Sequence, residues 1–314
     1  MIFLKALVTG ASGFVGLRLI EKLSDQNIDV LGISRTKSYE NLRETGKWKC
    51  DILDQAALTN IVSDYRPDYL FHLAAPAYIP DSYNNPRETY NIIFNGTQNL
   101  LEIAKGYVPN VRMLYVSSAD VYGQNLNNRI KETDPYDPIN PYSAAKSCSE
   151  LLCLQYHQSF ETQVVIARPF NHTGPGQSKE FVCSNFALQV AKIANDSGSN
   201  KTLYTGNIEV ERDFLDIRDV VDAYHRLIDK GSVGEIYNVC SGRATSIQEI
   251  ISTLFEIAGI NDYVIKSDPL KVRKSEISKR VGDNSKLIEC TEWKQKYELK
   301  QTLAQLLYFW RRKI

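Results

Sequence analysis

Residues 7–16 have the sequence LVTGASGFVG, which places Gly10, Gly13 and Gly16 between a strand pattern and a helix pattern. The strand pattern covers residues 4–8, and apolar residues recur at helical spacing over residues 14–23. A pyrophosphate needs close backbone approach and free N–H donors at a helix N-terminus, and glycines at such a turn supply both. The stretch therefore predicts a dinucleotide site. The spacing is GxxGxxG rather than GxGxxG, and the alternative is a turn with a structural role alone.

Strand and helix patterns alternate along the first half of the chain. Short β-branched runs occur at residues 30–33, 69–73, 113–117 and 163–167, and helix-length stretches separate them. This alternation predicts a parallel sheet covered by helices on both faces, the doubly wound α/β arrangement of a Rossmann fold.

Composition and charge exclude several classes of function. Lys plus Arg and Asp plus Glu both total 37, so the chain lacks the basic field that nucleic-acid binding needs. The start MIFLKALVTGASG has no secretory-signal pattern, and no apolar run approaches the about 18 residues of a membrane span. The six cysteines show no CxxC and no metal-ligand spacing, which predicts reduced and mostly buried thiols. We expect a cytoplasmic protein without nucleic-acid, membrane or metal partners.

The second strand ends in VLGISRT, residues 30–36, and this end indicates the cofactor type. An NAD site normally places Asp or Glu there, to accept from the ribose 2′-hydroxyl. This chain has Ser34 and Arg35. Because a guanidinium pairs well with a 2′-phosphate, NADP(H) is predicted, the alternative being a solvated surface arginine. Asp51 and Ile52, after the third strand, are expected to flank the adenine.

The segment NPYSAAK, residues 140–146, places Tyr142 and Lys146 four residues apart on one face of a helix. We expect the neighbouring ammonium to stabilise the phenolate and lower the pKa of Tyr142, so that it exchanges protons with a substrate oxygen. Ser118, in the strand-end segment LYVSSADVYG, is expected to bond the same oxygen. Each feature alone is common, and a solvated pair or a turn serine is the plain alternative.

The regular alternation of strand and helix patterns ends after Pro169. The Gly- and Pro-bearing loop NHTGPGQ comes first, and a helix pattern follows at residues 185–194. We expect an NADP-binding Rossmann domain over residues 1–170 and a smaller C-terminal α/β lobe over residues 171–314. The strand-like EIYNVC, residues 235–240, is expected to rejoin the first sheet, so residues 208–243 return partly to the first domain.

Several segments together resemble the extended short-chain dehydrogenase/reductase (NAD-dependent epimerase/dehydratase) family, whose members act on nucleotide sugars. The resemblance covers nearly the whole chain, and the segments are TGASGFVG, FHLAA, SSADVYG, PYSAAK, RDFLDIRDVVDAY and YNVCSG. The stretch ARPFNHTGPGQ, followed by Phe181 and Val182, is most similar to GDP-4-keto-6-deoxy-D-mannose 4-reductases and GDP-mannose 4,6-dehydratases.

The resemblance implies roles for individual residues. Ser118, Tyr142 and Lys146 would be catalytic, and Lys146 would also hold the nicotinamide ribose. The C-terminal lobe would bind the nucleotide sugar. Further implied cofactor contacts are Gly10, Gly13, Phe14, Val15, Leu73, Ala74 and Ala75, and implied substrate contacts are Asn171 for the sugar, Val182 for the base, Arg212 and Arg273 for the diphosphate and Glu276 for the ribose.

The residues after Ser118 separate the reactions of the resembled enzymes. Similar dehydratases have Thr, then Asp or Ser, then Glu there, whereas this chain has Ser118, Ala119 and Asp120. The loss of the middle polar group and the shorter carboxylate favour NADPH-dependent reduction of the C4 ketone of a GDP-4-keto-6-deoxyhexose, with Asp120 as a further candidate catalytic residue. The alternatives are a 4-epimerase, a GDP-mannose 4,6-dehydratase and a non-catalytic NADP redox sensor.

The resemblance also implies a homodimer, through helices near residues 91–104 and 142–156.

Overall fold

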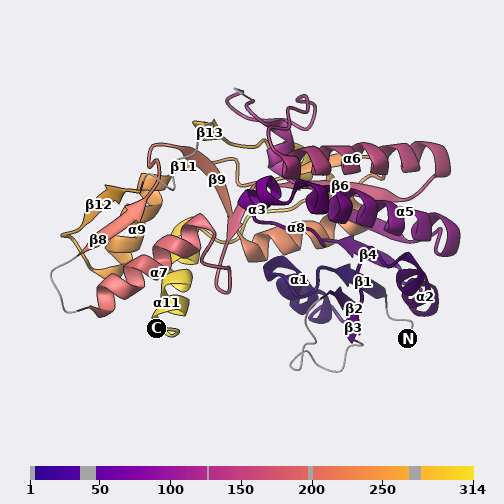
Figure 1. Cartoon of the computed structure of the whole chain (residues 1–314), viewed down its shortest axis with the longest axis horizontal. Coiled ribbons are helices and arrows are strands. Elements are labelled where there is room, and N and C mark those ends of the chain that lie inside the picture. The colour runs from indigo at the N-terminus through magenta and orange to yellow at the C-terminus, as the bar shows by residue number, and fades with distance from the viewer. Residues whose placement is uncertain (1–3, 36–46, 126, 197–200, 269–276) are drawn as a thin grey trace.

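A parallel sheet forms the centre of the larger part of the molecule (Figure 1). The computed structural model describes residues 4–35, 47–125, 127–196, 201–268 and 277–314. Among them, seven strands pair in the order β10-β6-β5-β4-β1-β2-β3. Their bounds are β1 Lys5–Thr9, β2 Asp29–Ser34, β3 Lys47–Lys49, β4 Tyr69–His72, β5 Arg112–Val116, β6 Val164–Pro169 and β10 Ile236–Val239. The order reverses between β1 and β4, where ligands of such sheets bind at the carboxyl ends of the strands.

Helices cover both faces of this sheet, as the alternating pattern predicted. Successive strand residues point into two separate apolar cores, which explains why the strands are apolar without interruption. One core is completed by α1 Phe14–Ser24, α8 Ile217–Lys230 and α10 Ser285–Thr291, and the other by α2 Gln55–Tyr65, α5 Gly96–Tyr107 and α6 Pro141–Phe160. The strand predicted within residues 235–240 joins the sheet as β10, parallel to β6.

Short elements lead into the site from two sides. Before α5 come α3 Ile79–Asn84, α4 Pro86–Tyr90 and a π-helix, Asn91–Asn95. After β5 the chain turns into a 3-10 helix, η2, Ala119–Tyr122. These elements place side chains at the carboxyl end of the sheet rather than within it.

A smaller α/β lobe has an apolar core of its own. Three helices enclose this core, α7 Val182–Asn195, α9 Ile247–Ala258 and α11 Leu299–Arg311. The strands of the lobe are β7 Asn171–Thr173, β8 Thr202–Thr205, β9 Glu211–Asp216, β11 Ala244–Ser246, β12 Val264–Ser267 and β13 Lys279–Arg280. Because β9 pairs with β7, β11 and β13, it is the central strand of the lobe.

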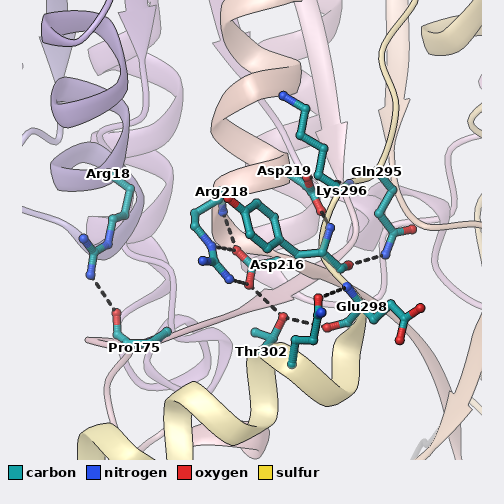
Figure 2. Close-up of polar contacts among 11 residues, drawn as sticks. Arg18, Pro175, Asp216, Arg218, Asp219, Gln295, Lys296, Glu298 and Thr302 are labelled. Atoms are coloured by element: carbon teal, nitrogen blue, oxygen red, sulfur yellow. Dashed lines mark hydrogen bonds and ion pairs between the residues drawn. The ribbon is translucent and has the colours of Figure 1, made fainter.

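Buried carboxylates at the start of α8 fasten the lobe to the Rossmann core (Figure 2). Asp216 caps α8 and accepts a 2.7 Å hydrogen bond from the hydroxyl of Thr302 in α11. One turn later, Asp219 accepts from the main-chain N–H groups of Lys296 and Tyr297, both at 3.0 Å. Burial raises the pKa of Asp219. Hydrogen bonds at the start of α8 therefore connect the smaller lobe to the Rossmann core.

Two general expectations can be compared with the fold. Four of the six cysteines are buried, Cys50, Cys153, Cys183 and Cys240, and all six are free thiols, so the prediction of mostly buried thiols is confirmed. Within the described residues, no helix combines the length and the apolar content that crossing a membrane requires.

Candidate active site

The glycine turn after β1 is so tight that Gly10 and Gly16 have no room for a side chain. Gly10 has a φ of +69°, and its carbonyl accepts a 2.9 Å hydrogen bond from the N–H of Gly13. A Cβ on Gly16 would lie 2.3 Å from that carbonyl oxygen, and a Cβ on Gly10 would lie 2.9 Å from the nitrogen of Ala74. No described side chain caps the first turn of α1. Its N–H groups, including those of Phe14 and Val15, therefore fit a pyrophosphate.

The ends of β2 and β3 form the neighbouring part of the site. The Ser34 hydroxyl donates to the Ser12 hydroxyl at 2.8 Å, which ties the end of β2 to the glycine turn. Arg35 is exposed and lies 3.8 Å from the carboxylate of an exposed Glu88, a distance at which the ion pair is weak. This guanidinium is free to meet an anionic ligand without breaking a strong contact.

Asp51 and Ile52 follow β3 and occupy a tight turn. A carboxylate oxygen of Asp51 accepts from the N–H of Leu53 at 3.0 Å. Ile52 is buried against Gly96, where a Cβ would lie 2.4 Å from the Cδ1 of Ile52. The turn is therefore rigidly placed beside the ends of β2 and β3.

A buried hydrogen-bond chain positions residues 73–75 opposite the glycine turn. The N–H of Ala74 donates to the Thr9 hydroxyl at 3.3 Å, and that hydroxyl lies 2.8 Å from Nδ1 of His72. Nε2 of His72 lies 3.0 Å from the Thr97 hydroxyl, which itself donates to a main-chain carbonyl. Nε2 must therefore carry the ring proton, and Nδ1 accepts from Thr9. Burial lowers the pKa of His72 to about 3, so the ring is neutral and serves as a brace.

Tyr142 and Lys146 lie one turn apart at the start of α6, as the sequence predicted. Asn140 caps this helix by accepting from the N–H of Ser143 at 2.8 Å. Both side chains are buried. The Lys146 ammonium donates to the carbonyl of Val116 at 2.6 Å and lies 6.0 Å from the centre of the Tyr142 ring.

The pKa values of this pair differ from the sequence-based expectation. Burial, and then the charge of Asp120, raise the pKa of Tyr142, and the hydrogen bond with Ser118 offsets only part of this. The expectation of a lowered pKa was wrong because the phenol is desolvated and the Lys146 ammonium is turned toward a carbonyl. The pKa of Lys146 is lowered to about 8, by burial, with Glu150 opposing. A raised pKa keeps the Tyr142 phenol protonated at neutral pH, beside a charged lysine.

Ser118 and Asp120 are brought next to Tyr142 by η2. The Ser118 hydroxyl caps η2 by accepting from the N–H of Asp120 at 3.1 Å, and it lies 3.5 Å from Oδ2 of Asp120. Oδ1 of Asp120 forms an ion pair with Arg280 of β13. Arg280 also donates to the carbonyl of Gly123 at 2.9 Å, and its buried Nε has no hydrogen-bond partner among the described residues.

A buried ion pair braces the segments around the site. The Glu150 carboxylate is fully buried and accepts from Arg168 at 2.6 Å, from the Tyr136 hydroxyl at 2.9 Å and from the Ser117 hydroxyl. The Arg168 guanidinium lies 4.7 Å from the centre of the Tyr122 ring, at the end of η2. This network therefore joins β5, β6, η2 and α6.

Sequence reasoning missed both Arg280 and Glu150. Nothing near Arg280 in the sequence marks it as a partner of Asp120. Glu150 could have been found, because it follows Lys146 by one helical turn and so shares its face of α6.

The lobe supplies the remaining predicted residues. Asn171 is exposed in β7, and Val182 opens α7 with about a third of its surface exposed (36%). Arg212 lies in β9, directly beside Arg280 of β13. Arg273 and Glu276 fall outside the described residues. Within the described part of the chain, no cluster of three or more His, Cys, Asp or Glu side chains is placed to hold a metal.

Comparison with known proteins identifies the family. The family model described as GDP-mannose 4,6 dehydratase matches residues 7–306. The chain belongs to this family. The GDP-6-deoxy-D-mannose reductase of Pseudomonas aeruginosa is 36% identical, over 99% of this chain and 98% of that protein. The GDP-6-deoxy-D-talose 4-dehydrogenase of Aggregatibacter actinomycetemcomitans is 32% identical, over 91% of this chain and 90% of that protein.

A solved relative has the same fold. The structure of RMD from Pseudomonas aeruginosa, complexed with NADPH, matches with a TM-score of 0.87 and 35% identity, over 99% of this chain and all of that one. The match spans the sheet and the smaller lobe together. The family membership and the α/β Rossmann fold with a C-terminal lobe are therefore confirmed.

Proposed function

We propose that the chain reduces the C4 ketone of a GDP-4-keto-6-deoxyhexose, with GDP-4-keto-6-deoxymannose as its substrate, and forms a GDP-6-deoxyhexose at the expense of NADPH. The observation that carries the proposal is the position of the Tyr142 phenol, buried beside Ser118 at the carboxyl end of the sheet, where burial raises its pKa. The likeness to a GDP-6-deoxy-D-mannose reductase over almost the whole chain supports the same reaction.

The glycine turn and the ends of β2 to β5 form the cofactor site, and a solved relative complexed with NADPH supports this choice of cofactor. Bound NADPH would supply the hydride. Arg35, with Ser34 beside it, would pair with the 2′-phosphate, since these two residues stand at the end of β2 where an NAD site has Asp or Glu. The other cofactor contacts in this proposal are Gly10, Gly13, Phe14, Val15, Asp51, Ile52, Leu73, Ala74, Ala75, Tyr142 and Lys146.

The protein's own contribution is proton transfer at the C4 oxygen. Ser118 and Tyr142 would donate hydrogen bonds to the carbonyl oxygen and so orient it. As hydride reaches C4, the Tyr142 O–H bond breaks and its proton joins the new alkoxide. Lys146 does not contact the Tyr142 hydroxyl, but its charge, 6.0 Å from the centre of the ring, would stabilise the tyrosinate that remains. A phenol whose pKa is raised suits this donor role, because it arrives protonated.

Residues 171–314 would bind the nucleotide sugar, and residues 1–170 would bind the cofactor; of the returning segment 208–243, α8 and β10 complete the Rossmann domain, whereas β9 belongs to the lobe. In this proposal the sugar meets Asn171, the base meets Val182, and the diphosphate and ribose meet Arg212, Arg273 and Glu276. Arg212 suits the diphosphate because its strand, β9, runs beside the Arg280 strand that reaches the catalytic segment.

The alternative reactions make different demands on the site. A 4-epimerase starts by oxidising C4, so Tyr142 would have to begin as a base, which its raised pKa opposes. A dehydratase needs a free carboxylate beside Ser118, and Asp120 is held by Arg280. A redox sensor has no need of Tyr142 and Lys146 buried one turn apart.

One assay separates these functions. The purified chain, incubated with NADPH and GDP-4-keto-6-deoxymannose, should oxidise one NADPH per ketone reduced, followed as loss of the nicotinamide absorbance. NMR of the product then assigns the configuration at C4, 6-deoxymannose or 6-deoxytalose. An epimerase would leave NADPH unchanged, and a dehydratase would act on GDP-mannose instead. No NADPH loss with any of several 4-keto nucleotide sugars contradicts the proposal.

We also propose a cytoplasmic homodimer. Free, mostly buried thiols suit a reducing compartment. A surface hollow between α4, the π-helix and α6 is lined by residues 84–88, 90, 91, 94, 95 and 148, and the exposed Tyr90 and Leu151 come from the same helices. The mass in solution, measured by light scattering, tests the dimer.

A further inference from the structure

The ion pair between Asp120 and Arg280 joins the catalytic segment to the substrate lobe. Asp120 lies in η2, directly after β5 of the Rossmann sheet, and Arg280 lies in β13, beside the central strand of the lobe. Both side chains are mostly buried, with 20% and 10% of their surfaces exposed. The second guanidinium contact, to the carbonyl of Gly123, fixes the arginine in place. Asp120 is thus held from the far side of the site.

The other carboxylate oxygen faces the reacting groups. Oδ2 of Asp120 lies 3.5 Å from the Ser118 hydroxyl, and its charge raises the pKa of Tyr142. A bound ketone oxygen at Ser118 and Tyr142 would therefore bring the carbons next to C4 close to this carboxylate. Hydrogens on carbons next to a ketone are acidic, so a free carboxylate there is a base that a reductase does not need.

We propose that Arg280 is a positioning residue that holds the Asp120 carboxylate and prevents it from deprotonating the carbons next to the C4 ketone; this rests on the proposed function. The suppressed step is enolisation. A C–H bond next to C4 breaks, its electron pair forms the carbon–carbon double bond of an enol, the C4 oxygen takes the Tyr142 proton, and Asp120 takes the carbon-bound proton. Return of a solvent-derived proton to carbon restores the ketone, with or without inversion. Arg280 thereby keeps the site committed to reduction.

Deuterium exchange measures this step directly. The enzyme with NADP⁺, which cannot donate hydride, is incubated with GDP-4-keto-6-deoxymannose in D2O, and the mass of the sugar nucleotide is followed. We expect Arg280→Met to incorporate deuterium at least tenfold faster than wild type. Arg280→Lys, which keeps a cation, should stay near the wild-type rate, and the double variant Asp120→Asn with Arg280→Met should return to it.

Controls separate this role from simple loss of structure. Arg226→Met removes a partly buried ion pair with Asp222 on α8, away from the site, and should exchange at the wild-type rate. The melting temperature of the double variant should fall by less than the sum of the decreases in Asp120→Asn and Arg280→Met, since the partners are coupled.

The outcomes assign failure to one proposal or the other. The role of Arg280 is overturned if Arg280→Met exchanges no faster than wild type. It is also overturned if the double variant exchanges as fast as Arg280→Met. Both results count even if the wild type consumes NADPH normally. A wild type that consumes no NADPH with 4-keto sugars overturns the proposed function instead.

Discussion

The ammonium of Lys146 donates a 2.6 Å hydrogen bond to the main-chain carbonyl of Val116, at the end of β5. The contact joins the catalytic helix to the strand whose continuation carries Ser118. The ammonium is buried there, and burial is the main reason why the pKa of Lys146 is lowered and that of the Tyr142 phenol is raised.

The lowered pKa of Lys146 predicts a pH dependence near 8. Above the folded value of about 8 the amine becomes neutral and no longer stabilises a tyrosinate, so kcat/KM for ketone reduction should fall as pH rises. Lys146→Arg should show no such limb between pH 7 and 10, because arginine stays charged. An unchanged limb in that variant would show that another group is titrating.

The same shift predicts a trend in stability. Between the folded value of about 8 and the ordinary value of 10.5, the unfolded chain binds more protons at this lysine than the folded chain. The contribution of Lys146 to the free energy of unfolding should therefore rise with pH across this window. Urea unfolding of wild type and Lys146→Met at pH 7.5 and pH 10 measures it, and the difference between the two proteins should change with pH.

Removal of the Tyr142 hydroxyl should stop turnover and spare the cofactor. Tyr142→Phe keeps the buried ring but loses the proton donor, so the reduction rate should fall about 100- to 10,000-fold. NADPH affinity, followed by fluorescence titration, should stay within a factor of about three, since the variant keeps the glycine turn, Lys146 and the ring of residue 142. Tenfold weaker binding would show that the hydroxyl holds the cofactor instead.

Arg35 should decide between NADPH and NADH. Loss of a charge-assisted bond to the 2′-phosphate costs about 1.5–3 kcal/mol, so Arg35→Ala should weaken NADPH binding roughly 10- to 100-fold and leave NADH unchanged. Arg311→Ala, at an exposed position in the last turn of α11, is the matched control. Equal weakening of both cofactors would contradict recognition of the 2′-phosphate.

A matched pair of glycine substitutions tests the turn. In Gly16→Ala the new Cβ would lie 2.3 Å from the carbonyl oxygen of Gly10 and 2.9 Å from Cα of Ala11, so the turn must move. NADPH affinity should fall at least tenfold. In Gly106→Ala, an exposed position of α5, the Cβ meets nothing within 4 Å, and stability should rise by about 0.5–1 kcal/mol.

The buried pair of Glu150 and Arg168 should behave differently from a surface pair. Glu150→Gln leaves the Arg168 charge buried without its partner, which should cost about 3–5 kcal/mol of unfolding free energy. Glu256→Gln, which breaks an exposed pair with Lys300, should change stability little. Urea denaturation of both variants measures the contrast, and similar losses would contradict it.

Much of the architecture and half of the site could be predicted from the sequence. The glycine turn, the uninterrupted apolar strands and the pair Tyr142 and Lys146 are local patterns, because strand and helix periods bring near neighbours onto one face or into one turn. The direction of the Tyr142 pKa shift could not be predicted this way. It depends on how deeply the phenol is buried and on where the Lys146 ammonium points.

The sequence by itself determined the family, the sheet with its glycine turn, and the candidate for the proton donor, Tyr142. Only the tertiary structure decided what surrounds that donor. Asp120 and Arg280 are separated by 160 positions and meet because β13 docks beside β9 across the site, and Glu150 is paired because α6 packs on the sheet against Arg168. Such contacts form only when the whole chain has folded, because a charge that packing removes from water needs an ion-pair or hydrogen-bond partner.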